Sequence, residues 1–138
     1  MFEVIYYSRS GNTRKLAEVI AKELGVTAEN VKTKQSLAAG SFVVIGSGNY
    51  GNKPGKDMIN FLNSVDFTGH KVAILETSGG ASGKGALFME EIIKARGGAI
   101  FDKWTCRAQF LCANRGRPNE SDFAAARQWA WDIQKAVS

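Results

Sequence analysis

The chain has 138 residues, of which 44% are hydrophobic and 22% charged, and its formal net charge is +5. Its length suits one core, so we expect a single domain over residues 1–138. No apolar run approaches the ~20 residues of a membrane span, so we expect a cytoplasmic protein, and Lys and Arg are too scattered to make nucleic acid an expected partner.

Strands and helices are predicted to alternate along the chain. Apolar runs rich in Val, Ile and Phe predict strands, and most of them are almost continuously apolar, which is typical of strands buried on both faces of a sheet. Between and after these runs, apolar residues recur every three or four positions, as on the buried side of a helix, and Asn119 or Ser121 is placed to cap the last helix. The predicted strands are Phe2–Tyr7, Asn30–Thr33, Phe42–Gly46, Lys71–Leu75 and Ala99–Thr105, and the helical patterns span residues 16–24, 58–62, 86–95 and 123–137.

This alternation predicts an α/β fold, a doubly wound parallel sheet with helices on both faces. In such sheets ligands bind beyond the carboxyl ends of the strands, so the loops that follow the strands are the candidate site. We number these loops in chain order: the first loop is Ser8–Thr13, the second Ser47–Gly55, the third Thr77–Gly85 and the fourth Arg107–Arg117.

The first loop, SRSGNT, consists mostly of small hydrogen-bonding residues and leads into a predicted helix. A helix N-terminus has unpaired N–H groups and partial positive charge, so a loop of this kind suits an anion. Ser8, Ser10 and Thr13 supply hydroxyl groups, Asn12 supplies an amide, and Gly11 lets the backbone approach a ligand closely. Hydrogen bonds to a charged group contribute about 1.5–3 kcal/mol each, so several of them would hold a phosphate without a metal ion. The alternative is an ordinary helix-capping turn.

Three other classes of phosphate-binding protein are excluded by the spacing or the type of particular residues. A Walker loop needs four residues between its first glycine and its Gly-Lys pair, whereas only three separate Gly79 from Gly83. A thiolate phosphatase needs a cysteine where Ser8 stands, because the thiolate is the nucleophile. A phosphoacceptor receiver domain needs carboxylates at strand ends, and here those ends carry Tyr7 and Ser47.

The sequence resembles the flavodoxin family over nearly its whole length. The segment YYSRSGNTRKLAE is similar to the family's hydroxyl-rich loop and first helix, FVVIGSGNYGNKPGKDMINFL to its third strand and flavin-flanking loop, and HKVAILETSGG to its fourth strand and the loop behind it. The resemblance is to short flavodoxin-domain proteins that bind FMN. It implies a flavodoxin-like doubly wound five-stranded parallel sheet with strand order 2-1-3-4-5.

The resemblance implies an FMN-binding electron-transfer protein that shuttles electrons between a reductase and an unknown acceptor. It places the FMN phosphate on the first loop and the isoalloxazine ring between the second and third loops, where Tyr50 is the one aromatic residue and suits a planar ring. No residue is assigned a catalytic or metal-binding role. The implied cofactor-binding residues are Ser8, Arg9, Ser10, Gly11, Asn12 and Thr13 in the first loop, Ser47, Gly48, Asn49, Tyr50, Gly51 and Asn52 in the second, and Thr77, Ser78, Gly79 and Gly80 in the third.

The charge of this chain departs from the family pattern, because ordinary flavodoxins are strongly acidic. The second and third loops contain no Asp or Glu, whereas Lys53, Lys56 and Lys84 lie in them or just beyond. We therefore expect redox partner proteins with acidic surfaces, since electron-transfer partners are steered by complementary charge. We also expect the second one-electron reduction of FMN to have a higher potential than is usual in the family, because few carboxylates oppose the added negative charge.

Two other functions remain open from the sequence. The third loop lacks the second aromatic residue that many flavodoxins place against the ring, and Trp104 is expected in the core. An open flavin face would suit a small FMN-dependent oxidoreductase, such as a quinone reductase or a protoporphyrinogen-oxidase-like enzyme. The other alternative is a flavodoxin-fold interaction module without flavin. Cys106 and Cys112 are too few for a disulfide framework and are expected to be buried thiols, with a redox pair as the alternative.

Overall fold

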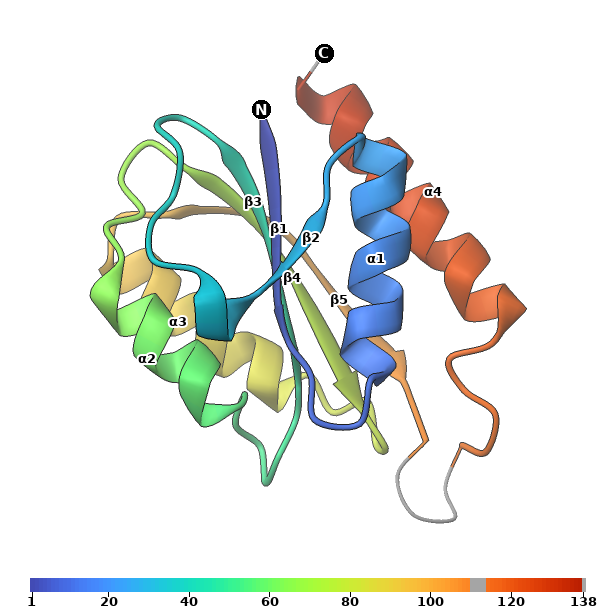
Figure 1. The fold of residues 1–138 in the computed structure, drawn as a ribbon. Helices are drawn as coiled ribbons and strands as arrows, with labels where there is room; N and C mark the ends of the chain where they lie inside the picture. Colours follow the sequence, from blue (N-terminus) through green and yellow to red (C-terminus); the bar gives the residue numbers. More distant parts are fainter. Residues whose placement is uncertain (110–113, 138) are drawn as a thin grey trace.

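The structure, a computed structural model, describes residues 1–109 and 114–137. Strands and helices alternate along this part of the chain, as the sequence predicts (Figure 1). The elements are β1 (Phe2–Tyr7), α1 (Asn12–Leu24), β2 (Ala28–Asn30), a 3-10 turn η1 (Val31–Thr33), β3 (Phe42–Gly48), α2 (Lys56–Ser64), β4 (Lys71–Ser78), α3 (Lys84–Ala95), β5 (Ala99–Arg107) and α4 (Glu120–Val137).

The strands form a parallel sheet in the order β2-β1-β3-β4-β5, which confirms the predicted fold class and strand order. Helices α1 and α4 cover one face of this sheet, and α2 and α3 cover the other (Figure 1). The chain runs from β1 to β2 on one side and then returns to β3 on the other side. The loops after β1 and β3 therefore meet where the direction of winding changes, which is the usual ligand position in such sheets.

The bounds of four strands differ from the prediction: β2 is displaced, and β3, β4 and β5 continue further than expected. The second strand, expected at Asn30–Thr33, lies at Ala28–Asn30, because the side chain of Asn30 accepts a hydrogen bond from the Lys32 N–H at 2.9 Å and turns the chain into η1. Strands β3 and β4 also continue beyond their apolar runs, since Gly48 pairs in register with Thr77. Several predicted loop residues therefore belong to rigid strand ends.

Each face of the sheet has its own apolar core. Neighbouring strand residues point to opposite faces, so Val4 contributes to the core under α1 and α4 while Ile5 contributes to the core under α2 and α3. This explains why the strand sequences are continuously apolar. The first core also contains Leu16, Ile20, Leu75, Ala130 and Ile133, and the second contains Ile45, Met58, Leu62, Ile74 and Met89. Trp104 packs at the margin of the first core, with its ring centroid 5.5 Å from that of Trp129.

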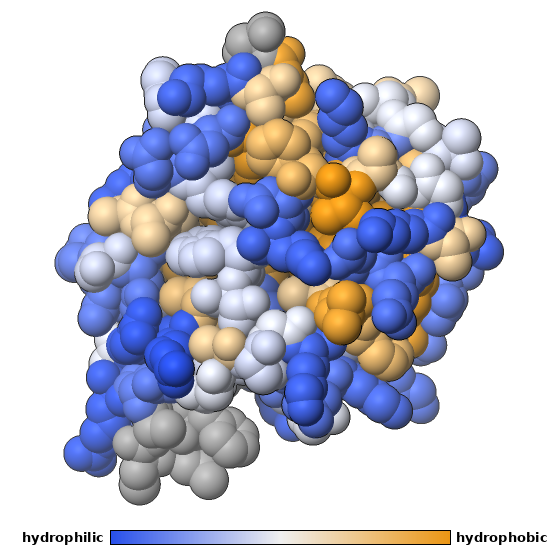
Figure 2. Space-filling model, turned by 180° about the vertical axis from the view of Figure 1, so that it is seen from behind, coloured by the Kyte–Doolittle hydropathy of each residue, from blue (hydrophilic) through white to orange (hydrophobic). Residues whose placement is uncertain are grey.

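Several large apolar side chains remain exposed on the described surface, and Met1, Phe101 and Val137 among them gather around Phe42 at the amino ends of the strands. The exposed side chains are Met1, Leu87, Phe101, Trp131 and Val137. On the face seen in Figure 2, apolar residues form separate areas among hydrophilic ones, which is ordinary for a protein surface. Within residues 1–109 and 114–137, no helix combines the length and the apolar character needed to cross a lipid bilayer.

Candidate functional site

The loops that follow β1, β3, β4 and β5 enclose a small pocket at the carboxyl ends of the strands. Its volume is about 50 Å³, which can enclose a phosphate-sized group, whereas sites that enclose a whole ligand measure several hundred Å³. A larger ligand would extend beyond it. We call it the loop pocket, and its lining residues are Ser10, Asn12, Thr13, Gly48, Asn49, Tyr50, Thr77, Ser78, Gly79, Ala108 and Gln109.

The N-terminus of α1 opens into the loop pocket without a side-chain cap. Gly11 is the N-cap residue with a φ of 95°, a left-handed conformation that favours glycine, and no side chain accepts a hydrogen bond from the first turn. The first helical bond runs from the Lys15 N–H to the Gly11 carbonyl at 3.0 Å, so the N–H groups before Lys15 have no helical partner. Together with the exposed Ser10 hydroxyl, these donors match the chemistry of a phosphate.

The other two hydroxyls of the first loop shape it from within. The Gly11 N–H donates to Ser8 Oγ at 3.0 Å, which closes the turn before the helix. The hydroxyls of Thr13 and Thr77 lie 2.8 Å apart in a buried hydrogen bond that ties α1 to the end of β4. Ser10 is therefore the exposed hydroxyl of this loop with no described internal partner, while the Ser8 hydroxyl accepts from Gly11 and keeps its own O–H for a ligand.

The second loop is closed by Ser47, which lies beneath it and is fully buried. Its Oγ donates to the Gly48 carbonyl at 2.9 Å and accepts from the Gly55 N–H at 3.0 Å. At the tip, Gly51 and Asn52 have φ values of 65° and 69°, and the flanking Tyr50 N–H donates to the Lys53 carbonyl at 2.7 Å. Ser47 thus acts on the shape of the loop and does not line the loop pocket.

Tyr50 leans from the second loop toward the first. Its hydroxyl accepts from the Arg9 N–H at 3.3 Å, and the Arg9 guanidinium lies over its ring, 4.2 Å from the centroid. Tyr7 meets the same ring nearly perpendicularly, with centroids 5.9 Å apart. Burial of the ring raises the pKa of the Tyr50 phenol, while the Arg9 N–H and positive charge act to lower it.

The third loop is braced from two directions. The Ser78 hydroxyl accepts from the Ala81 N–H at 2.7 Å, and the Gly79 carbonyl accepts from Asn114 Nδ2 at 2.7 Å and from Arg107 Nη1 at 3.4 Å. The Ala108 N–H donates to the Ser78 carbonyl at 3.0 Å. The fourth loop thereby holds the third loop at the mouth of the loop pocket.

A buried carboxylate supports the second and third loops from below. Glu76 is fully buried, and its two oxygens accept from the Ala86 N–H at 2.9 Å and from the Gly83 N–H at 3.1 Å. These donors belong to the N-terminus of α3, so the side chain acts as its cap. Asn49 Nδ2 also lies 3.4 Å from Glu76 Oε1. The carboxylate is therefore a fixed structural anion beneath the site.

The structure brings most of the predicted cofactor-binding residues to one place. Those that surround the loop pocket without lining it are Ser8, Arg9, Gly11, Ser47, Gly51, Asn52 and Gly80. The sequence prediction missed Ala108 and Gln109, although the fourth loop follows a strand like the other three, which was the available signal. Asn12 Nδ2 donates to the Gln109 carbonyl at 3.3 Å and so joins the first and fourth loops.

The cysteines offer no redox pair within the described residues. Cys106 is buried, and burial raises its pKa from 9.0 to about 11, so its thiol is unreactive at neutral pH. Cys112 lies outside the described residues. In residues 1–109 and 114–137, no group of His, Cys, Asp and Glu side chains has the arrangement of a metal site.

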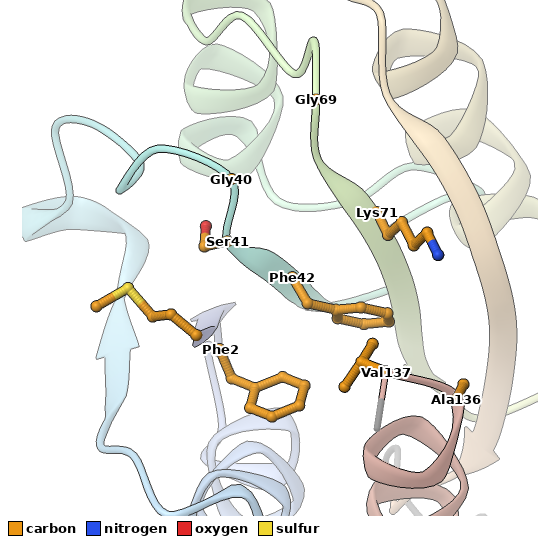
Figure 3. Close-up of a pocket in the computed structure, with 9 residues that line it drawn as sticks. Phe2, Gly40, Ser41, Phe42, Gly69, Lys71, Ala136 and Val137 are labelled. Carbon is orange, nitrogen blue, oxygen red and sulfur yellow. The ribbon is translucent and has the colours of Figure 1, made fainter.

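A larger hollow of about 420 Å³ lies at the opposite, amino ends of the strands (Figure 3). Phe2, Phe42 and Val137 form its apolar side, and Lys71 lies at its edge. None of its described lining residues belongs to a helix N-terminus, and the loop residues there, such as Gly40 and Gly69, lead into the amino ends of strands. The loop pocket in contrast has a helix N-terminus without a side-chain cap and lies at the carboxyl ends of the strands. Size alone therefore does not identify the functional site here.

Comparison with known proteins agrees with this geometry. The family model described as Flavodoxin domain matches residues 3–103. An uncharacterized protein of Methanocaldococcus jannaschii is 29% identical over 137 residues, which cover 90% of this chain and 91% of that protein. Oxidised Flavodoxin 1 from Bacillus cereus has a TM-score of 0.77 at 19% identity, with 99% of each chain covered. The Fusobacterium nucleatum flavodoxin bound to flavin mononucleotide has a TM-score of 0.71 at 15% identity, with 98% of this chain and 97% of that chain covered. At these identities the solved structures show a shared fold.

Proposed function

This chain belongs to the flavodoxin domain family, whose cofactor is FMN, and we propose that it binds FMN in the loop pocket and transfers electrons between partner proteins. The observation that carries the proposal is the uncapped N-terminus of α1, which opens into a pocket bounded by the loops of four neighbouring strands. A flavodoxin of the same fold holds flavin mononucleotide. The bound flavin supplies the one-electron and two-electron chemistry.

The residues present fit the phosphate end of this cofactor. Backbone N–H groups of the first turn of α1 and the Ser10 hydroxyl are hydrogen-bond donors, and the positive end of the helix dipole favours a dianion. Tyr50 offers an aromatic surface, and backbone groups at Gly79 and Gly80 offer polar contacts where no side chain intervenes. The protein thus supplies binding and orientation.

The lining of the loop pocket favours an electron carrier over a hydrolytic or acid–base enzyme. Among its described lining residues, Tyr50 is the one ionisable side chain, and burial raises its pKa further above neutrality. The pocket therefore holds no group that exchanges protons near neutral pH. Exposed cations surround it, including Arg9, Lys53, Lys84 and Arg107, so the partner proteins would present acidic surfaces.

The first test is an absorption spectrum of the protein after incubation with FMN and removal of free flavin. The proposal predicts a bound flavin spectrum and quenched flavin fluorescence. Ser10→Ala removes one hydrogen bond to a charged group and is expected to weaken FMN binding roughly 10- to 150-fold. Ser36→Ala changes an exposed serine far along the chain and serves as the control. Protein that stays colourless would refute the proposal.

A small FMN-dependent oxidoreductase is the second candidate, because the third loop has only small residues from Ser78 to Gly83 and so leaves a path for a small substrate. Turnover of a nicotinamide nucleotide with a quinone by the pure flavin-loaded protein would establish this alternative. A carrier requires a separate reductase protein for the same reaction.

A further inference from the structure

Arg9 and Tyr50 form the one contact between a guanidinium and an aromatic ring described at the loop pocket. They come from different loops, and two interactions join them: the guanidinium carbon lies 4.2 Å from the ring centroid, and the Arg9 N–H donates to the phenol oxygen at 3.3 Å. A cation over an aromatic face at this distance is attracted by the ring's quadrupole. Arg9 of the first loop therefore holds the side chain of Tyr50 in the second loop.

The remaining surroundings of Tyr50 restrict where its ring can go. Its hydroxyl lies over Gly48, where an added Cβ would come within 2.5 Å of the phenol oxygen. The ring of Tyr7 meets that of Tyr50 nearly perpendicularly, with centroids 5.9 Å apart. Arg9 covers one face of the ring, so that face is closed to a second planar group. An incoming flavin would have to stack on the other face or displace Arg9.

We propose that Arg9 is a positioning residue of the flavin site, which acts by stacking on Tyr50 and fixing that ring for contact with the isoalloxazine of FMN on its opposite face. The inference rests on the proposed function. The proposed role differs from that of a cation that attracts the phosphate, because the Arg9 guanidinium lies over the Tyr50 ring. It also gives this basic chain a reason for an arginine at this position, since a planar guanidinium suits the face of an aromatic ring better than a lysine ammonium does.

Riboflavin separates the two roles of Arg9, because it has the isoalloxazine ring but no phosphate. Arg9→Met is expected to weaken the binding of FMN and of riboflavin by the same factor, roughly five- to thirtyfold, which corresponds to a partly desolvated cation–π contact. In a Tyr50→Leu background the same change should have no further effect, because the contact is already lost. Arg127→Met is the control, since Arg127 is an exposed arginine on α4 and lies outside the loop pocket.

Each other result of these titrations would overturn the inference. A loss confined to FMN would make Arg9 a phosphate ligand, and an equal loss in the Tyr50→Leu background would show that Arg9 acts independently of the ring. Tighter binding by Arg9→Met would show that the guanidinium obstructs the flavin. If the unmodified protein bound neither flavin, the proposed function would fail first and the inference with it.

The flavin-free protein gives an independent readout. If Arg9 holds the ring in place, Arg9→Met lets the ring move into solvent, and the pKa of Tyr50 falls toward its ordinary value because burial is what raises it. If Arg9 is only a nearby charge, its removal raises that pKa instead. Ultraviolet titration of tyrosinate distinguishes the two signs, with Tyr50→Phe identifying the signal of this residue. A rise in the Tyr50 pKa would contradict the positioning role.

Discussion

Replacing Glu76 by glutamine tests whether the buried carboxylate beneath the site maintains the N-terminus of α3. Both oxygens of Glu76 accept N–H groups of this helix, from Gly83 and Ala86. A glutamine keeps one acceptor and places an NH₂ group against the other donor. The variant therefore loses one hydrogen bond to a charged acceptor and the favourable charge at the helix dipole, about 2–4 kcal/mol together.

Urea unfolding followed by far-ultraviolet circular dichroism measures this loss, and Glu91→Gln is the matched control because Glu91 is exposed on the same helix. The control is expected to stay within about 0.5 kcal/mol of the unmodified protein. Since Asn49 also contacts Glu76, the second loop should loosen and FMN binding should weaken in parallel. If Glu76→Gln were as stable as Glu91→Gln, the helix end would be satisfied without the carboxylate and the capping argument would be wrong.

Three further predictions follow from the charges of the described chain. Burial raises the Cys106 pKa from 9.0 to about 11, so the free energy of unfolding should fall as the pH rises through this interval, and Cys106→Ala should lack that slope in pH-dependent urea titrations. Arg117 lowers the pKa of Asp122 below 3.8. The ionised carboxylate therefore stabilises the folded state fully above pH 3.8, and this contribution is lost as the pH falls through the folded-state pKa. Asp122→Asn should lower the free energy of unfolding by about 1–2 kcal/mol at neutral pH and by little at low pH. Lys84→Glu, at the exposed start of α3, should lower the potential of the second one-electron reduction of FMN in spectroelectrochemistry, because it adds a negative charge beside the site.

The layer arrangement was accessible from the sequence because burial on both faces leaves a strong signal, whereas the strand order came from the resemblance to the flavodoxin family. Val4 and Ile5 are adjacent, yet they fill different cores, and only a strand buried on both sides needs apolar residues at both positions. The second strand was misplaced because it is short and its burial is only partial. Its end is set by the Asn30 side chain, a local hydrogen bond that hydrophobic periodicity does not reveal.

The sequence predicted which loops form the candidate site, but it did not predict which of their residues face a ligand and which shape the loops. The sequence shows that Ser, Thr and Asn follow the strands and could bind an anion. It does not show their hydrogen-bond partners, because these depend on the folded structure. Ser47 and Thr13 were both grouped with ligand-binding residues, and the structure gives their hydroxyls internal partners in Gly55 and Thr77. No sequence pattern distinguishes such a hydroxyl from the free one at Ser10, because the pairing joins residues far apart in the chain.

The contacts among the loops suit the proposed FMN site, in which most of the cofactor would extend beyond so small a pocket. In the proposed site the phosphate would lie at the N-terminus of α1, and the Thr13–Thr77 hydrogen bond ties that helix to the end of β4. The isoalloxazine ring would lie against loops that are joined by side-chain contacts such as that of Arg9 with Tyr50. Preorganised donors lower the entropic cost of binding an anion, so the phosphate should dominate the initial affinity. The ring contacts would then depend on how firmly the second loop is held, and the proposed role of Arg9 adds a restraint from the first loop to those that Ser47 and Glu76 supply.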